Sequence, residues 1–406
     1  MNSRPETLRR DARPRGLDTG DAGPPTTTGE QAGPAESAAS SSTTQDMAPA
    51  TKTRRGVGRV RGVWALALLG AALVLAVMLA TAIGAVGISP LTTAGVLWNQ
   101  LPLVPHVLRA WSHADELILL QLRLPRVVGA ALVGAALAVA GTLFQGLLRN
   151  PLADPFLLGT SAGAALGAAI GFVVPAVAVA QWLGFSLVAI LGFAGALGAA
   201  AAVYAIATRR GQTPVVTLLL AGVAVSAILS AAQTLVISLQ QRTGLRILSL
   251  YYWLAGGVNV QSWAQIWVLL PLVALAIGGA LLLAPALDAF ALGERMAAHL
   301  GLPVERAKLA ITAMAALLVA AAVSISGLVG FVGLVAPHVC RITLGPRHRL
   351  LVPASALAGA IFVVLADLLA RTIASPSELP LGVVTALVGG PFFLWLLRGA
   401  GRAYRW

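Results

Sequence analysis

The chain has 406 residues, of which 58% are hydrophobic and 11% are charged, with a formal net charge of +13. Soluble domains hold about 45–50% apolar and about 25% charged residues, so this composition excludes a soluble globular protein, a disordered chain and a nucleic-acid module. A mean hydropathy of +0.84 requires a lipid bilayer as the solvent, and the sequence therefore predicts an all-α polytopic membrane protein.

The first segment, residues 1–60, is rich in Pro, Gly, Ser and Thr and has no apolar periodicity. Such a segment cannot bury enough surface to offset its ordering entropy, so it is predicted to be a disordered tail. The first apolar run begins only near Val63 and is long enough to span a bilayer, which distinguishes it from a signal peptide. The basic residues just before it predict a cytoplasmic anchor, and residues 61–406 form the predicted membrane domain.

The rest of the chain alternates apolar runs with short polar breaks, and a membrane span needs roughly 20 residues. The predicted spans are 63–86, 126–147, 155–175, 185–207, 214–239, 262–284, 306–325, 329–344, 350–373 and 380–398. The eighth run is short and contains Pro337, so nine spans is the alternative count. With the N-terminus inside, arginines favour the inside connections, and ten spans place both termini in the cytoplasm.

Several chemical sites are absent from the sequence. It has no phosphate-binding loop, only two lysines (Lys52 and Lys308), one cysteine, and no zinc-binding motif. We therefore predict no catalytic residue, no metal site and no cofactor. Asp367 is the one clear carboxylate inside a span, and Arg371 would lie one turn away on the same helix face. This pair predicts either a structural ion pair or a site for a proton or ion, and transport against a gradient would take its energy from a partner.

Four segments, in order, resemble a known family. They are Arg123-Leu-Pro-Arg126 followed by Gly141-Thr-Leu-Phe-Gln145; Arg149-Asn-Pro-Leu-Ala-Asp-Pro155; Leu292-Gly-Glu294 through Leu300-Gly301; and Gly327 through Pro337-His338 to Asp367, Arg371 and Glu378-Leu-Pro380. Together they make the chain similar to the FecCD-type permeases of ABC importers for iron–siderophore, haem and vitamin B12 uptake. The similarity covers roughly 63–398, and the long tail departs from the family pattern.

The resemblance implies a fold and a set of partners. The fold is vitamin-B12-permease-like (a type II ABC importer) with about ten helices, in a bacterial plasma membrane. The partners are a second permease subunit (a copy or a paralogue), two cytoplasmic ATPase subunits, an extracytoplasmic binding protein and membrane lipid, with no nucleic acid. Arg123, Arg126 and Arg371 would dock the binding protein through its carboxylates. The alternative is that these arginines reach lipid headgroups.

The largest inside connection, 285–305, mixes apolar and charged residues. Its glycines predict two short helices with a turn between them. The resemblance makes this segment the loop that couples to an ATPase, through Leu292, Gly293, Glu294, Arg295, Ala297, Leu300 and Gly301. The alternative is a plain connecting loop.

The remaining candidate residues are structural or gating ones. Asn150 and Pro151 predict an architectural corner, because proline forbids a straight helix there and asparagine bonds free backbone groups. Pro337 and His338 predict a broken short helix. Gln145, Asp367, Glu378 and Pro380 complete this group. The glycines within spans are interpreted as packing surface, or alternatively as the wall of a path.

The leading function is translocation of iron–siderophore complexes by the permease subunit of an ABC importer. Haem or cobalamin import by the same architecture is an alternative that the sequence does not separate. An ion-coupled secondary transporter, or a scaffold without transport, is the third.

Overall fold

The computed structural model describes residues 51–84, 86–100, 105–174, 177, 180–239 and 244–400. Residues 1–50 of the predicted tail lie outside the described residues. Helix α1 already begins at Thr51, so helical structure starts inside the segment that the sequence assigns to the tail.

The described elements are almost all helices. In chain order they are α1 Thr51–Ala82, α2 Pro90–Trp98, α3 His113–Leu117, η1 Ile118–Arg123, α4 Leu124–Leu148, η2 Pro155–Leu158, α5 Thr160–Val173, β1 Gln181–Trp182, β2 Phe185–Ser186, α7 Leu187–Ala207, α8 Val215–Ser238, α9 Gly244–Ala255, α10 Trp263–Leu282, α11 Ala284–Phe290, α12 Glu294–His299, α13 Val304–Ser326, α14 Val332–Leu344, α15 His348–Thr372 and α16 Leu381–Ala400.

Ten of these helices correspond to the ten predicted spans. Within the described ranges, seven are long and apolar enough to cross a membrane, and α5, α14 and α16 are shorter apolar helices. The prediction of an all-α polytopic membrane protein is confirmed. One detail of the prediction is wrong. The second span begins at His113 rather than at 126, because α3 and the π-helical turn η1 run directly into α4, and Pro125 lies just after this π turn. The connection between the fifth and sixth predicted spans also contains a helix that the sequence analysis does not predict, α9.

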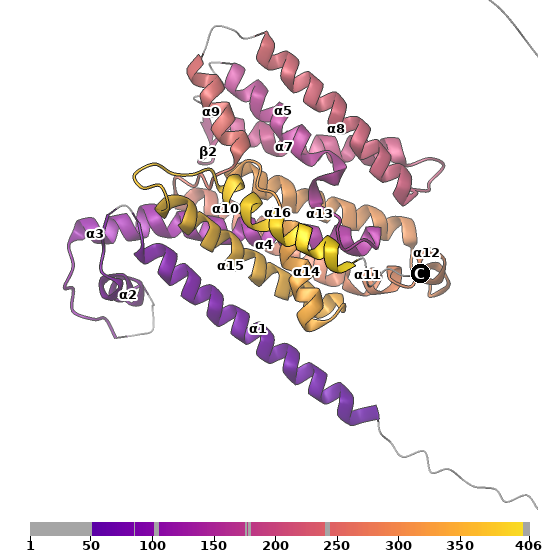
Figure 1. Ribbon diagram of the computed structural model, residues 1–406, viewed down its shortest axis with the longest axis horizontal. Helices are drawn as coiled ribbons and strands as arrows, with labels where there is room; N and C mark the ends of the chain where they lie inside the picture. The colour runs from indigo at the N-terminus through magenta and orange to yellow at the C-terminus, as the bar shows by residue number, and fades with distance from the viewer. Residues whose placement is uncertain are drawn as a thin grey trace, which may run out of the picture. The chain divides into compact units, whose positions relative to one another are not determined.

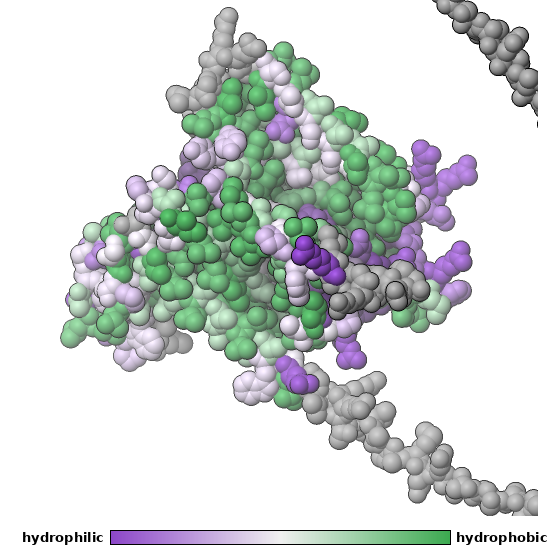
Figure 2. Space-filling view, viewed as in Figure 1, coloured by the Kyte–Doolittle hydropathy of each residue, from purple (hydrophilic) through white to green (hydrophobic). Residues whose placement is uncertain are grey.

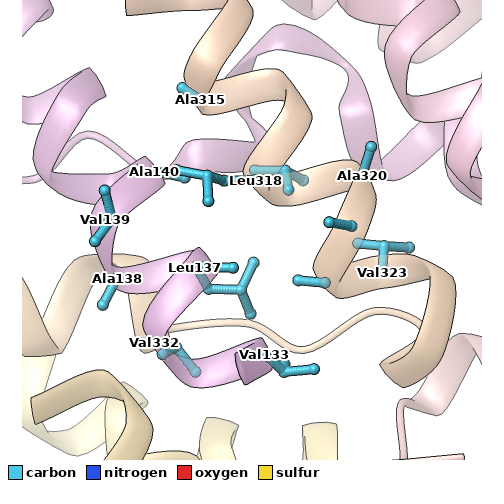
Figure 3. Packing of buried hydrophobic residues seen from close by; sticks show 14 of the residues in the cluster. Val133, Leu137, Ala138, Val139, Ala140, Ala315, Leu318, Ala320, Val323 and Val332 are labelled. Carbon is cyan, nitrogen blue, oxygen red and sulfur yellow. The ribbon is translucent and has the colours of Figure 1, made fainter. Parts of the chain in front are cut away.

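Helix α4 is the most enclosed element of the membrane domain. It packs along α13, α14 and α15, and the ribbon in Figure 1 shows it threaded between them. Val133 and Leu137 of α4 face Leu318 and Val323 of α13 in a cluster of buried hydrophobic side chains (Figure 3). Lipid tails are as apolar as these residues, so close packing, rather than exclusion of water, stabilises the contact.

Glycines permit this close approach. A Cβ added at Gly141 would overlap the carbonyl oxygen of Gly333 in the first turn of α14. One added at Gly134 would overlap the carbonyl oxygen of Gly359 in α15. In α5 and α7, a Cβ added at either Gly163 or Gly195 would overlap the carbonyl oxygen of the other. At these positions the glycines form packing surface.

Helices α5, α7 and α8 form a second group, drawn above α4 in Figure 1. A short hairpin of β1 and β2, in which Trp182 faces Phe185, precedes α7. The flanks of the helices carry exposed apolar side chains, seen as broad green areas in Figure 2. Such a surface is suited to lipid or to another membrane-embedded chain.

The two ends of the bundle differ in their polar residues. Helix α4 has 25 residues, about 37 Å of helix at 1.5 Å per residue. Arg126 lies in its first turn. The turn after its last residue leads to the side where Figure 2 shows charged residues gathered near α12. We name the two ends after Arg126 and Lys308. Exposed arginines at the Lys308 end include Arg149, Arg209, Arg210, Arg295, Arg306, Arg347 and Arg349.

Candidate functional site

Arg126 holds two carboxylates that are far away in the sequence. Its Nη1 and Nη2 atoms donate to the Oε1 and Oε2 atoms of Glu378, both at 2.9 Å. Its Nη2 and Nε atoms also donate to Oδ1 of Asp367, at 3.0 and 3.3 Å. The planar guanidinium therefore grips Glu378 through both oxygens, a fork that matches carboxylate geometry. Helix α4, helix α15 and the connection between α15 and α16 meet at this side chain.

Asp367 and Arg371 form the pair that the sequence predicts. The Nε atom of Arg371 lies 2.9 Å from Oδ2 of Asp367 on the same face of α15, and its Nη2 donates to the carbonyl oxygen of Ala80 at 3.1 Å. Both side chains are buried. In this position Arg371 is not available to a partner's carboxylate.

Arg123 is also enclosed rather than presented outward. Its Nη1 donates to the carbonyl oxygens of Thr81 and Ala82, at 3.1 and 2.8 Å, and its Nη2 donates to that of Val86. Thr81 and Ala82 are the last two residues of α1, where helical carbonyls need partners from outside the helix. Arg123 thus caps α1. Of the three arginines predicted to dock a partner, only Arg126 reaches a solvent-facing group, Glu378.

A cavity of about 610 Å³ opens beside this charge cluster. Arg126, Asp367 and Glu378 lie on its wall, with aromatic residues of α5 and α9. Most of its polar lining is uncharged: Ser186, Ser249, Asn259, Gln261, Gln265, Ser324 and Ser326. The wall carries one arginine and two carboxylates, and Arg371, which pairs with Asp367 behind the wall, brings the charge cluster as a whole to balance. Sequence reasoning missed this cavity, because its wall combines α9 with the segment that follows α13.

Acid is expected to release Glu378 from Arg126. The hydrogen bond from Arg126 holds the pKa of the Glu378 carboxyl below its usual value, against a smaller effect of burial. A carboxyl with a lowered folded-state pKa stabilises the fold above its unfolded pKa, near 4.3, and that contribution is lost as the pH falls through the lowered value. Melting temperatures of detergent-solubilised protein between about pH 6 and pH 3 test this. The wild type should lose more than Glu378→Gln, and parallel curves would contradict the expectation.

Gln145 fastens α4 to α14 inside the bundle. Its Nε2 donates to the carbonyl oxygens of Gly333 and Leu334, at 3.3 and 3.4 Å, and its Oε1 accepts from Arg341 at 3.4 Å. The prediction of a broken helix at Pro337 is wrong: α14 runs unbroken from Val332 to Leu344 with Pro337 inside it. His338 is buried, with its ring edge-on to Phe392 at 6.2 Å.

Asn150 forms the predicted corner at the end of α4. Arg149 takes a left-handed conformation there, and the Oδ1 atom of Asn150 accepts from the Leu152 backbone at 2.9 Å. Pro151 follows in the turn, and the next full helix starts only at Thr160. The corner turns the chain away from α4 toward η2.

The predicted coupling segment does contain two short helices, α11 and α12. Gly293 separates them with φ of 100°, a conformation that favours glycine. Leu292, Met296 and Leu300 are exposed by 64%, 52% and 66%. Ala297 is buried beneath them, and Arg295 is exposed. A rigid knob of apolar side chains surrounded by charge therefore projects at the Lys308 end.

Lys308 ties this knob to the rest of the bundle. Its ammonium, 4% exposed, donates to Glu294 of α12 at 2.7 Å, to Glu305 at 3.1 Å and to the carbonyl oxygen of Thr213 at 2.9 Å. Glu305 in turn accepts from the Thr213 backbone at 2.9 Å. Sequence reasoning missed this junction. The signal available was a single lysine in the first turns of a long apolar helix, with a glutamate three residues before it.

No group of three or more metal-ligating side chains gathers anywhere in the described part of the chain. Pro380 sits at the start of α16, where the following Leu381 donates its N–H to the carbonyl of Gly256 at 2.8 Å. The site residues therefore divide into a charge cluster with a cavity at one end and a knob with its lysine junction at the other.

Comparison with known proteins places the chain among membrane permeases. The model of the FecCD transport family matches residues 72–399. A cobalamin import system permease protein of Halobacterium salinarum is 43% identical over 76% of this chain and 81% of its own length. A hemin transport system permease protein of Yersinia pestis is 39% identical over 81% and 95%. An Fe(3+) dicitrate transport system permease protein of Escherichia coli is 40% identical over 70% and 84%. Among solved structures, an inward-facing conformation of a metal-chelate type ABC transporter matches with a TM-score of 0.70, at 27% identity, over 82% of this chain and 98% of that one.

Proposed function

The chain belongs to the FecCD transport family, and from this premise we propose that it is the permease subunit of an ABC importer that moves iron–siderophore complexes across the bacterial plasma membrane. Both termini would lie in the cytoplasm, the Arg126 end would face outward and the Lys308 end would face the ATPases. The excess of exposed arginines at the Lys308 end supports this orientation.

The observation that carries the proposal is the polar cavity beside Arg126. It is large and lined mainly by serines and amides, and each of its three charged side chains is engaged in an ion pair. These properties suit a bulky solute that forms many weak hydrogen bonds, and they do not suit a bare inorganic ion, which would need convergent charged ligands. A weakly binding wall is also what a transporter requires, since a tight site would retain its load.

The knob at the opposite end supports an external energy source. Three exposed apolar side chains on a short rigid segment fit a groove on a cytoplasmic ATPase subunit, and Lys308 would pass movement of α12 to α13 and to the turn before α8. The remaining partners are a second permease subunit, identical or paralogous, and an extracytoplasmic binding protein that docks near Arg126.

Two alternatives stay open to test. Relatives of this chain include permeases named for cobalamin and hemin, which keeps those solutes as the second candidate class. Coupling to an ion gradient is the third. Asp367 is already paired with two arginines, which supports a structural role for this carboxylate.

Uptake into cells lacking this gene is the deciding experiment. Iron-starved mutant cells should lose uptake of one class of labelled ferric siderophore and keep uptake of labelled haem and cobalamin. The intact gene should restore it, as should Leu275→Ala, which trims an exposed leucine in a span. A Leu292→Ala/Leu300→Ala variant that reaches the membrane should restore less than about a tenth, since coupling depends on the knob.

Other results lead to defined conclusions. Loss of haem or cobalamin uptake alone would show that this solute, and not an iron–siderophore complex, is the one transported. Uptake that survives a phosphate-loop lysine mutation in the partner ATPase, and collapses with a protonophore, would refute ABC transport. The ferric chelate whose uptake is lost is then immobilised on a resin. This resin serves to isolate the extracytoplasmic binding protein from the same cells.

A further inference from the structure

The two carboxylates that share Arg126 differ sharply in exposure. Asp367 is 2% exposed and lies within α15, whereas the Glu378 side chain is 52% exposed and lies in the connection between α15 and α16. Asp367 contacts Arg126 through one oxygen, Oδ1, and uses its other oxygen for Arg371. Glu378 covers the outer edge of the guanidinium with both of its oxygens.

The buried carboxylate is sufficient to orient Arg126. It accepts from both Nε and Nη2, so the plane of the guanidinium is fixed without help from Glu378. The exposed carboxylate adds a second, solvent-accessible pair of bonds. An ion pair that water reaches contributes little to stability, so it exchanges readily for another of the same kind.

The backbone around Glu378 is held independently of its side chain. Leu379 donates its N–H to the carbonyl of Ala370 at 2.9 Å, and Leu381 donates to that of Gly256 at 2.8 Å. The Glu378 side chain can therefore leave Arg126 while the connection keeps these two bonds. The same connection forms part of the cavity wall.

We propose that Glu378 is an internal stand-in for a carboxylate of the docking protein. In the free permease it occupies the outward edge of Arg126. When the binding protein docks, one of its Asp or Glu side chains takes the two N–H groups that Glu378 releases, while Asp367 keeps its hold on the inner edge. This inference rests on the proposed function, because it requires a partner that docks at the Arg126 end.

The exchange has two consequences. Docking affinity is reduced by the fraction of molecules in which Glu378 occupies the fork, as for any partner that needs a partly populated state. Docking also frees the Glu378 side chain on the cavity wall. The arrival of the partner therefore changes the contacts of the connection that leads into α16. A permease without a partner keeps its exposed guanidinium neutralised.

Glu378→Gln tests the competition. The permease with its ATPase is placed in lipid nanodiscs and titrated with the binding protein isolated as described above, and docking is measured by biolayer interferometry. The variant should lower the half-saturating concentration by about twofold to fivefold, the range expected for an exposed ion pair. The matched control is Glu116→Gln, another carboxylate at this end, which pairs weakly with Arg109 at 4.0 Å and should leave docking unchanged. Unchanged or weaker docking by Glu378→Gln would overturn the inference.

A spin label tests the release without altering the pair. Ser377 is exposed beside Glu378, and a nitroxide on Ser377→Cys should become more mobile when the binding protein is added. Equal mobility in the free and docked states would also overturn the proposal. If the binding protein fails to dock on the wild type, the proposed function itself is refuted. If it docks on the wild type but Glu378→Gln does not change its affinity, only the inference about Glu378 is refuted.

Discussion

Gly141→Ala is expected to prevent the membrane domain from reaching its folded state. The added Cβ would overlap the Gly333 carbonyl oxygen and lie 2.7 Å from its Cα. All of these are backbone atoms, and they cannot turn aside as a flexible side chain can. Alanine gains about 1 kcal/mol of helix propensity over glycine. Overpacking costs about 1–3 kcal/mol where side chains can yield, and more where only backbone can move, so the clash dominates.

The chain supplies a matched control for this change. Gly198 lies in α7 with nothing within 4 Å of its notional Cβ, so Gly198→Ala gains the same propensity without a clash. Yield of monodisperse protein in mild detergent and the midpoint of unfolding by SDS measure the outcome. We expect Gly198→Ala to match the wild type and Gly141→Ala to be lost or greatly destabilised. Equal midpoints for both variants would show that α4 and the start of α14 are not in contact.

Asp367→Asn is expected to be the most damaging polar substitution. It removes one charge from between two arginines, and Arg371, with 8% of its side chain exposed, keeps only backbone carbonyls, those of Ala80 and of residue 367 itself, as partners. Removing one partner of a buried ion pair costs about 3–5 kcal/mol. Glu378→Gln in the same cluster should cost under about 1 kcal/mol, because that carboxylate is half exposed.

A double variant separates a structural role from a transport role for Asp367. In Asp367→Asn/Arg371→Gln the stranded cation is gone, so the free energy of unfolding in SDS should recover in part and the two changes should not add. If Asp367 is structural, transport should also stay insensitive to a protonophore. A stable Asp367→Asn protein that has lost only transport would indicate an ion site instead.

Local chemistry accounts for the features that the sequence predicts correctly. Hydropathy alone locates the spans, because a bilayer permits few structures other than apolar helices. The four-residue spacing of Asp367 and Arg371 is enough to pair them on one face. The corner at Asn150 and the glycine turn at Gly293 follow from the backbone preferences of those residues.

Contacts between distant segments were not predictable in this way. Arg126 was predicted to dock carboxylates of a partner, and its pairing with residues of its own chain more than two hundred positions later was not predicted. Nothing in the local sequence of Arg126 indicates which helix end will lie beside it. Lys308 depends likewise on the α7–α8 turn, and α9 is too short and too mixed in polarity to be recognised as a membrane element. Arg123 likewise donates to the last carbonyls of α1, a contact that its own surroundings in the sequence do not indicate.

The enclosure of α4 also bears on how the molecule can change shape. Most of this helix is buried, and α13 is similarly enclosed, whereas α8 is largely open to its surroundings. A helix in backbone contact with α14 and α15 cannot rotate or slide by itself, because each contact admits only one register. We therefore expect α4 to stay fixed relative to α14 and α15. We expect a change in access to the cavity to involve the group of α5, α7 and α8, since α8 is the least enclosed of these helices and the turn before it contacts Lys308.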